Sequence, residues 1–197
     1  MTKLRSRSSA QGGFTLIETM IAIAILSIGI VTMIAAFGTA INATQNSQYN
    51  LIMREKALQA MESVYTARNT QQITFSQIAN VSNGGIFTNG AVQLLCAGPD
   101  GLVNTSDDVN CAASGPCPAG PECIVLPGPD GILGTPDDQP MSLANFTRSI
   151  QINSTLESDG VTINPTLKQV IVTITYTTGG TNVPHTYTVT ALISSYS

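Results

Sequence analysis

The stretch GGFTLIETMIAIAILSIGIVTMIAAFGTAI, residues 12–41, decides the architecture of this 197-residue chain. From Phe14 onward it is apolar for 28 residues, and about 20 apolar residues in a helix suffice to cross the hydrocarbon core of a membrane. The preceding leader contains no acid and carries three bases, Lys3, Arg5 and Arg7. By the positive-inside bias, the leader is expected in the cytoplasm and everything after the apolar run on the outer side of an inner membrane.

The order of these segments differs from that of an ordinary secretory signal, in which a small-residue cleavage site follows a short apolar stretch. Here the small residues Gly12 and Gly13 precede the apolar run. A cut before the run keeps it in the mature protein as an anchor, whereas a cut after the run discards it. The order therefore predicts a removable leader, residues 1–13, and a retained membrane helix.

One residue of the apolar run is charged. Glu18 is the only charged side chain between Arg7 and Arg54, and a carboxylate at the centre of a membrane helix costs about 2.5–3.5 kcal/mol on insertion scales unless it is paired. Either Glu18 lies near the membrane surface and is solvated, or it pairs with a positive charge. Cleavage after Gly13 would create such a charge, the α-amino group of Phe14, in the same chain or in a neighbouring copy.

The segment Gly13-Phe14-Thr15-Leu16-Ile17-Glu18, followed by an apolar helix, resembles the class III leader and N-methylated helix of type IV pilins and type II secretion pseudopilins. The resemblance implies that a prepilin peptidase cuts after Gly13 and methylates Phe14. It also implies that Glu18 guides docking onto a neighbouring subunit, so the expected partners are this peptidase and other pilin subunits, contacted through the N-terminal helix. The Leu26-Ser27-Ile28-Gly29-Ile30 run, the absence of proline before Pro99 and the Thr-rich C-terminal part resemble PilV-type minor pilins.

The helix is expected to span residues 14–68, with residues 14–41 in the membrane or filament core. Residues 42–68 keep helix formers and apolar residues at helical spacing. The outward half is expected to cover a sheet with a face formed by Leu51, Leu58, Met61 and Tyr65. A helix of this length, about 80 Å, is too long for one small domain to cover, so its N-terminal half must be buried by lipid or by similar helices of other copies.

The remainder, residues 69–197, is predicted to form the globular head. Three stretches that alternate apolar and polar residues predict strands at 146–152, 168–177 and 185–193. Gly179-Gly180 predicts a hairpin turn between the last two strands. The inward faces are expected to carry Phe146, Ile150 and Ile152, then Val170, Val172, Ile174 and Tyr176, then Tyr187, Val189, Ala191 and Ile193.

The predicted fold is therefore α+β: a long helix whose second half packs on a small antiparallel sheet, residues 145–196. An irregular loop region, residues 96–140, is inserted before the sheet. It contains a duplicated motif, G-P-D-G-x-x-x-T-x-D-D, at residues 98–108 and 128–138. Pro-Asp-Gly alone predicts a turn, and such a turn does not require the two further aspartates.

The loops are strongly acidic, because seven acids and no Lys or Arg occur between Arg68 and Arg148. Three carboxylates on one short loop repel one another unless they are solvated or bridged by a cation. Ca²⁺ binds carboxylate and carbonyl oxygens in flexible geometry, although the spacing is not that of an EF-hand. Two alternatives stay open: a solvated acidic turn, or a calcium cofactor with the ligands Asp100, Asp107 and Asp108, and Asp130, Asp137 and Asp138.

The four cysteines fall within the same loop region, outside the cytoplasm, where an even number favours disulfides. Their spacing lacks the paired knuckles of a tetrahedral zinc site. Three pairings are possible for four cysteines. The preferred pairing joins Cys96 to Cys111, around the first acidic loop, and Cys117 to Cys123.

Charge and composition exclude other classes of function. Without the leader, five bases face twelve acids, a formal charge of −7, and no basic cluster suits a nucleic acid. The single histidine, His185, lies at a strand start without a nucleophile motif, and an enzyme is not expected. The leading hypothesis is a minor pilin of a type IV pilus, first in the inner membrane and then in an extracellular filament. The alternatives are a type II secretion pseudopilin, or a calcium-dependent adhesive or binding module displayed on the filament.

Overall fold

The computed structural model describes residues 13–177 and 183–196. It separates into two compact units, Met1–Ser47 and Gln48–Ser197, each described here by itself. Leader residues 1–12, which contain the predicted cytoplasmic bases, lie outside the described residues. So does Gly179-Gly180, the predicted hairpin turn.

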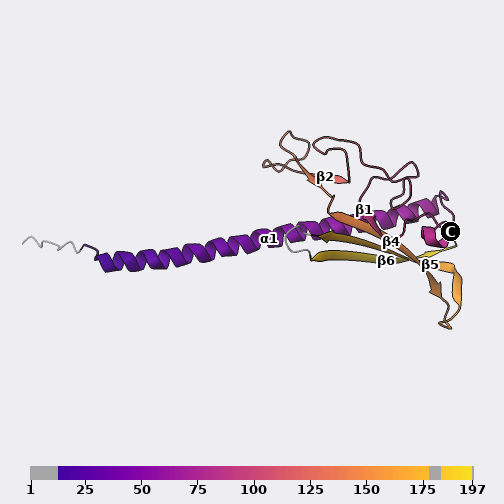
Figure 1. The fold of residues 1–197 in the computed structure, drawn as a ribbon, viewed down its shortest axis with the longest axis horizontal. Coiled ribbons are helices and arrows are strands. Elements are labelled where there is room, and N and C mark those ends of the chain that lie inside the picture. Colours follow the sequence, from indigo (N-terminus) through magenta and orange to yellow (C-terminus); the bar gives the residue numbers. More distant parts are fainter. Residues whose placement is uncertain (1–12, 178–182, 197) are drawn as a thin grey trace, which may run out of the picture. The chain divides into compact units, whose positions relative to one another are not determined.

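Helix α1 spans Leu16–Asn69 (Figure 1) and confirms the predicted long helix. The absence of proline allows 54 residues to form one helix. At its start, the hydroxyl of Thr15 accepts a hydrogen bond from the backbone N–H of Glu18 at 3.3 Å, as an N-cap does. At its end, Gln71 adopts a left-handed φ of 58°. The N–H of Gln72 then donates to the carbonyl of Ala67 at 2.9 Å, which closes the last turn.

The part of α1 in the first unit is apolar on all sides and exposed in the single chain. Among the described residues, α1 is the one helix long and apolar enough to cross a membrane. The hydroxyls between Leu16 and Ile41 all donate to a backbone carbonyl three residues earlier, which lowers the cost of placing them in lipid. These residues are Thr19, Ser27, Thr32 and Thr39.

In the second unit, α1 contributes to the core through a different face from the one predicted. The buried face repeats every three or four residues and consists of Met53, Ala57, Ala60, Val64 and Ala67. Met61 is buried as expected, but Leu51 and Leu58 are 66% and 44% exposed, so placing them on the covering face was wrong. Alanines form much of the contact because they let the helix backbone approach its neighbours closely, and the prediction gave too much weight to large side chains.

The main sheet is antiparallel, with the strand order β1-β4-β5-β6. Its strands are β1 (Ala91–Gln93), β4 (Phe146–Leu156), β5 (Ile163–Thr177) and β6 (Pro184–Ser194). The three predicted strands are confirmed, but β4 and β5 are longer than predicted and β1 was not predicted. Pairing of β5 with β6 runs without a register shift from Thr177 and Pro184 to Leu167 and Ser194.

The predicted inward faces of β4 and β5 are buried, as is Ile193 of β6. Tyr187, Val189 and Ala191 of β6 are partly buried against the same core. Tyr176 stacks between two other rings, with centroids 4.4 Å from Tyr49 of α1 and 4.5 Å from Phe146 of β4. All buried apolar residues lie at or after Ile52, so the core belongs to the second unit.

Asn80 takes the place of a strand beside β4. Its side-chain amide donates to the carbonyl of Ile150 at 2.7 Å and accepts from the N–H of Ile152 at 2.8 Å. Strand β1 pairs with β4 only as far as Ser149. The edge of β4 is therefore covered first by a short strand and then by a carboxamide.

A second, two-stranded sheet pairs β2 (Cys123–Leu126) with β3 (Gln139–Ser142). It adds a short antiparallel hairpin to the region predicted as an irregular loop. The second copy of the duplicated motif, residues 128–138, connects these two strands. Figure 1 shows this loop region apart from the main sheet, around the label β2.

Candidate functional site

The predicted processing site lies in accessible chain just before α1. Gly13 and Phe14 precede the helix and are exposed, and a Cβ atom on Gly13 would meet no atom within 4 Å. Glu18 lies in the first turn, where the partial positive charge of a helix N-terminus favours a carboxylate. The helix-capping role of Thr15 was missed, although the spacing of Thr15 and Glu18 is that of a capping box and could have indicated it.

The duplicated motif folds twice into the same loop. The first copy is closed by antiparallel pairing of Cys96 with Val109, and the second by pairing of Leu126 with Gln139. In both copies the fourth residue, Gly101 or Gly131, has a left-handed φ, 69° and 71° respectively. The N–H of this glycine donates to the carbonyl of the first residue of its copy at 3.0 Å.

The aspartates of the first copy accept hydrogen bonds from their own loop. Asp100 Oδ1 accepts from the N–H of Leu102 at 2.8 Å. Asp107 accepts from the Thr105 hydroxyl at 2.6 Å and from the N–H of Asp100 at 3.2 Å. Asp108 Oδ2 accepts from the N–H of Asn104 at 2.8 Å. The two later aspartates, which a Pro-Asp-Gly turn alone does not require, thus accept hydrogen bonds that close the loop.

The second copy repeats these contacts. Asp130, Asp137 and Asp138 accept from the N–H of Ile132, the hydroxyl of Thr135 and the N–H of Gly134 at 2.8, 2.6 and 2.8 Å. A Cβ on the first glycine of either copy, Gly98 or Gly128, would lie 2.3–2.5 Å from atoms of the facing aspartate. Glycine at that position is thus required by the close approach of the carboxylate.

The six aspartates lie in two separate loops, three in each. Within the described part of the chain, no group of three or more His, Cys, Asp or Glu side chains is arranged to hold a metal ion. One carboxylate oxygen, Oδ1 of Asp138, is buried without a hydrogen-bond partner. Calcium binding by these loops stays a prediction.

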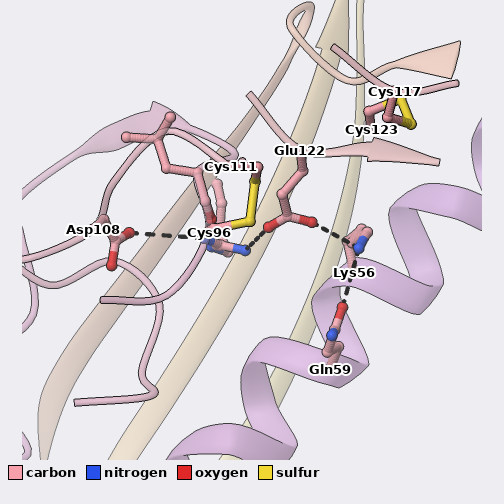
Figure 2. Close-up of a disulfide and its surroundings, with 10 residues drawn as sticks. Lys56, Gln59, Cys96, Asp108, Cys111, Cys117, Glu122 and Cys123 are labelled. Carbon is pink, nitrogen blue, oxygen red and sulfur yellow. Dashed lines mark hydrogen bonds and ion pairs between the residues drawn. A yellow bond between two sulfur atoms is a disulfide. The ribbon is translucent and has the colours of Figure 1, made fainter. Parts of the chain in front are cut away.

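Two disulfides stabilise the loop region, in the pairing that the sequence analysis preferred. Cys96 is bonded to Cys111 and Cys117 to Cys123, with Cα atoms 5.1 and 5.9 Å apart. The first encloses the first acidic loop, and the second lies in the segment that leads into β2 (Figure 2). The bridges therefore restrict a segment that has few apolar residues of its own.

A chain of charged groups connects the loop region to the helix and the sheet. Glu122 accepts from Lys56 Nζ of α1 at 2.7 Å and from Arg148 Nη1 of β4 at 3.2 Å. Figure 2 shows Glu122 directed toward Lys56, near the Cys96–Cys111 disulfide. Arg148 Nε donates to Asn104 Oδ1 at 2.8 Å, and Arg148 Nη2 lies 4.0 Å from Asp108 Oδ2. A single guanidinium thus contacts both the first acidic loop and the segment before β2.

Arg148 is 2% exposed and lies on the inward face of β4, between Phe146 and Ile150. Burial lowers the pKa of its guanidinium, and the charges of Glu122 and Asp108 oppose that shift. No role for Arg148 was predicted from the sequence. Its position on the inward side of an alternating strand was the available signal, because a buried cation needs partners.

A cleft of about 470 Å³ lies between α1 and the cysteine-bearing loops. Its lining includes Lys56, Glu122, Arg148 and both disulfides. The three charged side chains bind one another rather than pointing into the cleft with free hydrogen-bonding groups. These ion pairs connect α1, β4 and the segment before β2.

The loop carboxylates predict an acid-dependent stability. The hydrogen bond from Thr105 lowers the pKa of Asp107 below its ordinary value of 3.8. A carboxyl with a lowered folded-state pKa stabilises the fold above its unfolded pKa, and this contribution is lost as the pH falls through the folded value. The urea concentration at the unfolding midpoint should fall as the pH is lowered from about 5 to about 3. This fall should be smaller for Asp107→Asn than for the wild type.

Asp108→Asn is the matched control, because burial raises the pKa of Asp108. A raised carboxyl pKa stabilises the fold at low pH, and that contribution is lost as the pH rises. The Asp108 variant should steepen the decline toward acid rather than flatten it. Parallel profiles for the wild type and the Asp107 variant would contradict the assignment.

Comparison with protein-family models matches residues 8–34 to the prokaryotic N-terminal methylation motif. Comparisons with curated proteins and with solved structures gave no match. The matched segment contains Gly13, Phe14 and Glu18 and continues into the apolar half of α1.

The motif and the helix that follows it indicate a prepilin of the type IV pilin and pseudopilin-like class. Such a leader indicates processing by prepilin peptidase and anchoring in a membrane. The motif is found in structural rather than catalytic proteins. Cleavage after Gly13, methylation of Phe14 and docking through Glu18 stay predictions for these individual residues.

Proposed function

We propose that this chain is a minor pilin of a type IV pilus, cleaved after Gly13 and incorporated into the filament through α1. The observation that carries the proposal is the methylation motif at residues 8–34, which includes the start of the uninterrupted helix α1 and much of its apolar half. Within the described residues, the apolar window of this helix is not buried at all. Lipid before assembly, and the helices of other subunits after it, would supply the missing apolar surroundings.

Glu18 is the residue through which we propose that assembly is guided. After cleavage, the α-amino group of Phe14 becomes a positive charge at the start of the chain. A carboxylate in a filament core needs such a partner, since an unpaired charge there is costly. An incoming subunit whose Glu18 approaches the Phe14 amino group of a neighbour neutralises both charges. Thr15 supports this geometry because it caps the helix that positions Glu18.

The test is Glu18→Ala, compared with Glu55→Ala, which removes an exposed acid from the same helix. Loss of one member of a buried charge pair weakens an interface at least about tenfold. We expect the amount of the Glu18 variant in sheared filaments to decrease by at least that factor. Mass spectrometry should show that its leader is removed normally. The Glu55 variant should be incorporated like the wild type. Normal incorporation of the Glu18 variant would exclude the docking role.

A second experiment, deletion of the chain, separates the minor pilin from the pseudopilin alternative. Deletion of the chain should reduce the number or length of surface pili while type II secretion continues. Loss of secretion with normal pili would instead assign the chain to a secretion system. The methylated N-terminus is expected in either case, so it does not distinguish the two systems.

A second proposed function is calcium-dependent binding by the head through the two acidic loops. Two observations favour it: one motif is folded twice into the same loop, and Oδ1 of Asp138 is buried without a partner. A cation at the second loop would satisfy that oxygen and reduce repulsion between Asp137 and Asp138. Carboxylate and carbonyl oxygens in flexible loops are ligands that Ca²⁺ accepts.

Calorimetry and melting of the full chain in detergent test this second function, with and without millimolar calcium. We expect a higher melting temperature with calcium, and a smaller rise for Asp138→Asn than for the control Glu157→Gln. An unchanged melting temperature would exclude calcium binding. If calcium removal abolished surface binding while filaments still formed, the loops would serve binding rather than assembly.

A further inference from the structure

The β4–β5 hairpin ends in an exposed apolar tip, which we define as residues 156–163. Strand β6 ends opposite Leu167, so the tip extends beyond the end of β6. The N–H of Glu157 donates to the carbonyl of Thr162 at 2.7 Å, and Gly160 turns the chain with a left-handed φ of 70°. Asp159 accepts from the N–H groups of Val161 and Thr162 at 3.0 and 2.9 Å. The turn is thus fixed by its own hydrogen bonds.

This tip presents apolar side chains to solvent. Leu156 and Ile163 are cross-strand partners and share one face of the hairpin. They are 55% and 60% exposed, and Val161 is 82% exposed. None of the three belongs to the core of the second unit. Apolar side chains grouped on a preformed turn are typical of a docking site.

A second exposed apolar feature lies on α1 and consists of Leu51 and Leu58, here called the helix stripe. These residues are seven positions apart and share a helix face with Tyr65. The hydroxyl of Tyr65 donates to the carbonyl of Leu192 at 2.7 Å, so this side of the helix is directed toward β6. The stripe therefore runs beside the outer edge of β6.

The outer edge of β6 offers backbone hydrogen bonds along the stripe. Two hydrogen bonds show which backbone groups of this segment face outward. The carbonyl of Leu192 accepts from Tyr65 and so faces away from β5, whereas the N–H of Ser195 donates to the carbonyl of Thr166 and so faces β5. By alternation, the N–H and C=O groups of Thr186, Thr188 and Thr190 point away from β5. No other strand within residues 13–177 and 183–196 pairs with this edge. The strand has neither a charged residue nor a bulge to block pairing.

The tip and the stripe lie at opposite ends of the second unit. The tip extends beyond Ser194, whereas the stripe begins at Leu51, before the part of α1 that contacts Leu192 and Ser195. Two such features cannot meet within one copy. A contact between different surfaces of two copies is heterologous, so one copy contributes the tip and the other the stripe.

We propose that the hairpin tip of one copy docks on the helix stripe of a second copy, beside the outer edge of its β6. Leu156, Val161 and Ile163 cover Leu51 and Leu58, next to the free backbone groups of β6. Charge is complementary, because exposed Glu157 on the tip approaches exposed Arg54, which lies between the two leucines of the stripe. The contact rests on the proposed filament function and adds a connection between heads to the packing of the helices.

Cysteine cross-linking of the full chain, purified in detergent, tests the contact without requiring filaments. Val161→Cys and Leu58→Cys variants are mixed and oxidised. We expect about tenfold more dimer from the mixture than from either variant alone, the ratio that one well-buried apolar contact supplies. Val81→Cys, which is also about half exposed, replaces Leu58→Cys in the control mixture. It should yield only the background.

A charge exchange provides the second measurement. Glu157→Arg in the copy carrying Val161→Cys should lower the yield, and Arg54→Glu in the other copy should restore it. The proposal would be overturned by any of three outcomes: the Val81 control gives an equal dimer yield, dimers form mainly between identical variants, or no dimer forms. Repeating the cross-link in the Glu18→Ala background separates this contact from assembly through α1. The head contact should persist there even though incorporation fails.

Discussion

Replacing Arg148 with alanine is expected to lower the free energy of unfolding by about 3–5 kcal/mol, the range for removing one partner of a buried ion pair. The change leaves Asp108 without its cation and Asn104 Oδ1 without its donor. Glu122 keeps only Lys56. Because Arg148 contacts both the first acidic loop and the segment before β2, the loss should separate the acidic loop from the sheet rather than create a simple cavity.

Urea unfolding of the full chain in detergent, followed by near-ultraviolet circular dichroism, measures the effect. Arg54→Ala is the matched control, since it removes an exposed arginine of the same unit and should change stability by no more than about 0.5 kcal/mol. Arg148→Met tests the mechanism, because it fills the space but supplies no charge. If the Met variant were as stable as the wild type and Glu122 remained ordered, the ion pairs would not hold the loops.

Removing the Cys96–Cys111 disulfide by a double Cys→Ser substitution is expected to cost about 3 kcal/mol, as chain entropy predicts for a closed loop of this length. The bridge joins cysteines with a sequence separation of 15, and the loop between them includes the whole first copy of the duplicated motif. Without it, the hydrogen bonds of Asp100, Asp107 and Asp108 must hold the loop in position unaided. Both Asp108 and Asn104 would then be less well placed to contact Arg148.

The corresponding Cys117–Cys123 double variant is the control, because its loop separation is only 6. The entropy model predicts a smaller loss for the shorter loop. Thermal unfolding of both variants under non-reducing conditions shows which of them loses more stability. An equal or larger loss from the Cys117–Cys123 variant would show that the first bridge does not organise the acidic loop.

These two predictions concern one structural unit. The disulfides limit the freedom of a Gly- and Pro-rich segment, and the Lys56–Glu122–Arg148 ion pairs attach it to α1 and β4. Few apolar residues of this segment reach the core. The exceptions are Leu102 in its first loop and Leu94 and Leu143 at its margins, all of which are buried. Covalent and ionic contacts therefore replace part of the apolar burial that usually orders a loop.

Much of the architecture could be predicted because it depends on local pattern. An apolar run without proline determines a long helix, whichever residues surround it. Alternation along residues 146–152, 168–177 and 185–193 determined both the strands and their inward sides. The glycine positions of the duplicated motif indicated turns, and the structure places left-handed φ angles at Gly101 and Gly131.

Other features depended on contacts between distant segments. The face of α1 that enters the core was predicted wrongly, because closeness of approach favoured Ala57, Ala60 and Ala67 over the larger Leu51 and Leu58. The use of Asn80 as a substitute strand has no sequence signal, since it needs the edge of β4 beside it. The hydrogen-bond partners of Arg148 are 26 to 53 positions away in the chain, beyond the reach of any periodicity.

The sequence by itself determined the motif at Gly13–Glu18, the apolar helix behind it and the strand pattern, because each follows from the spacing of residue types along a few turns of chain. Only the tertiary structure decided what the acidic, cysteine-bearing loops rest on. Hydrogen bonds and ion pairs are short-ranged and directional. Which aspartate closes its own loop, and which faces Arg148, is therefore settled only when the helix, the sheet and the loops are brought together.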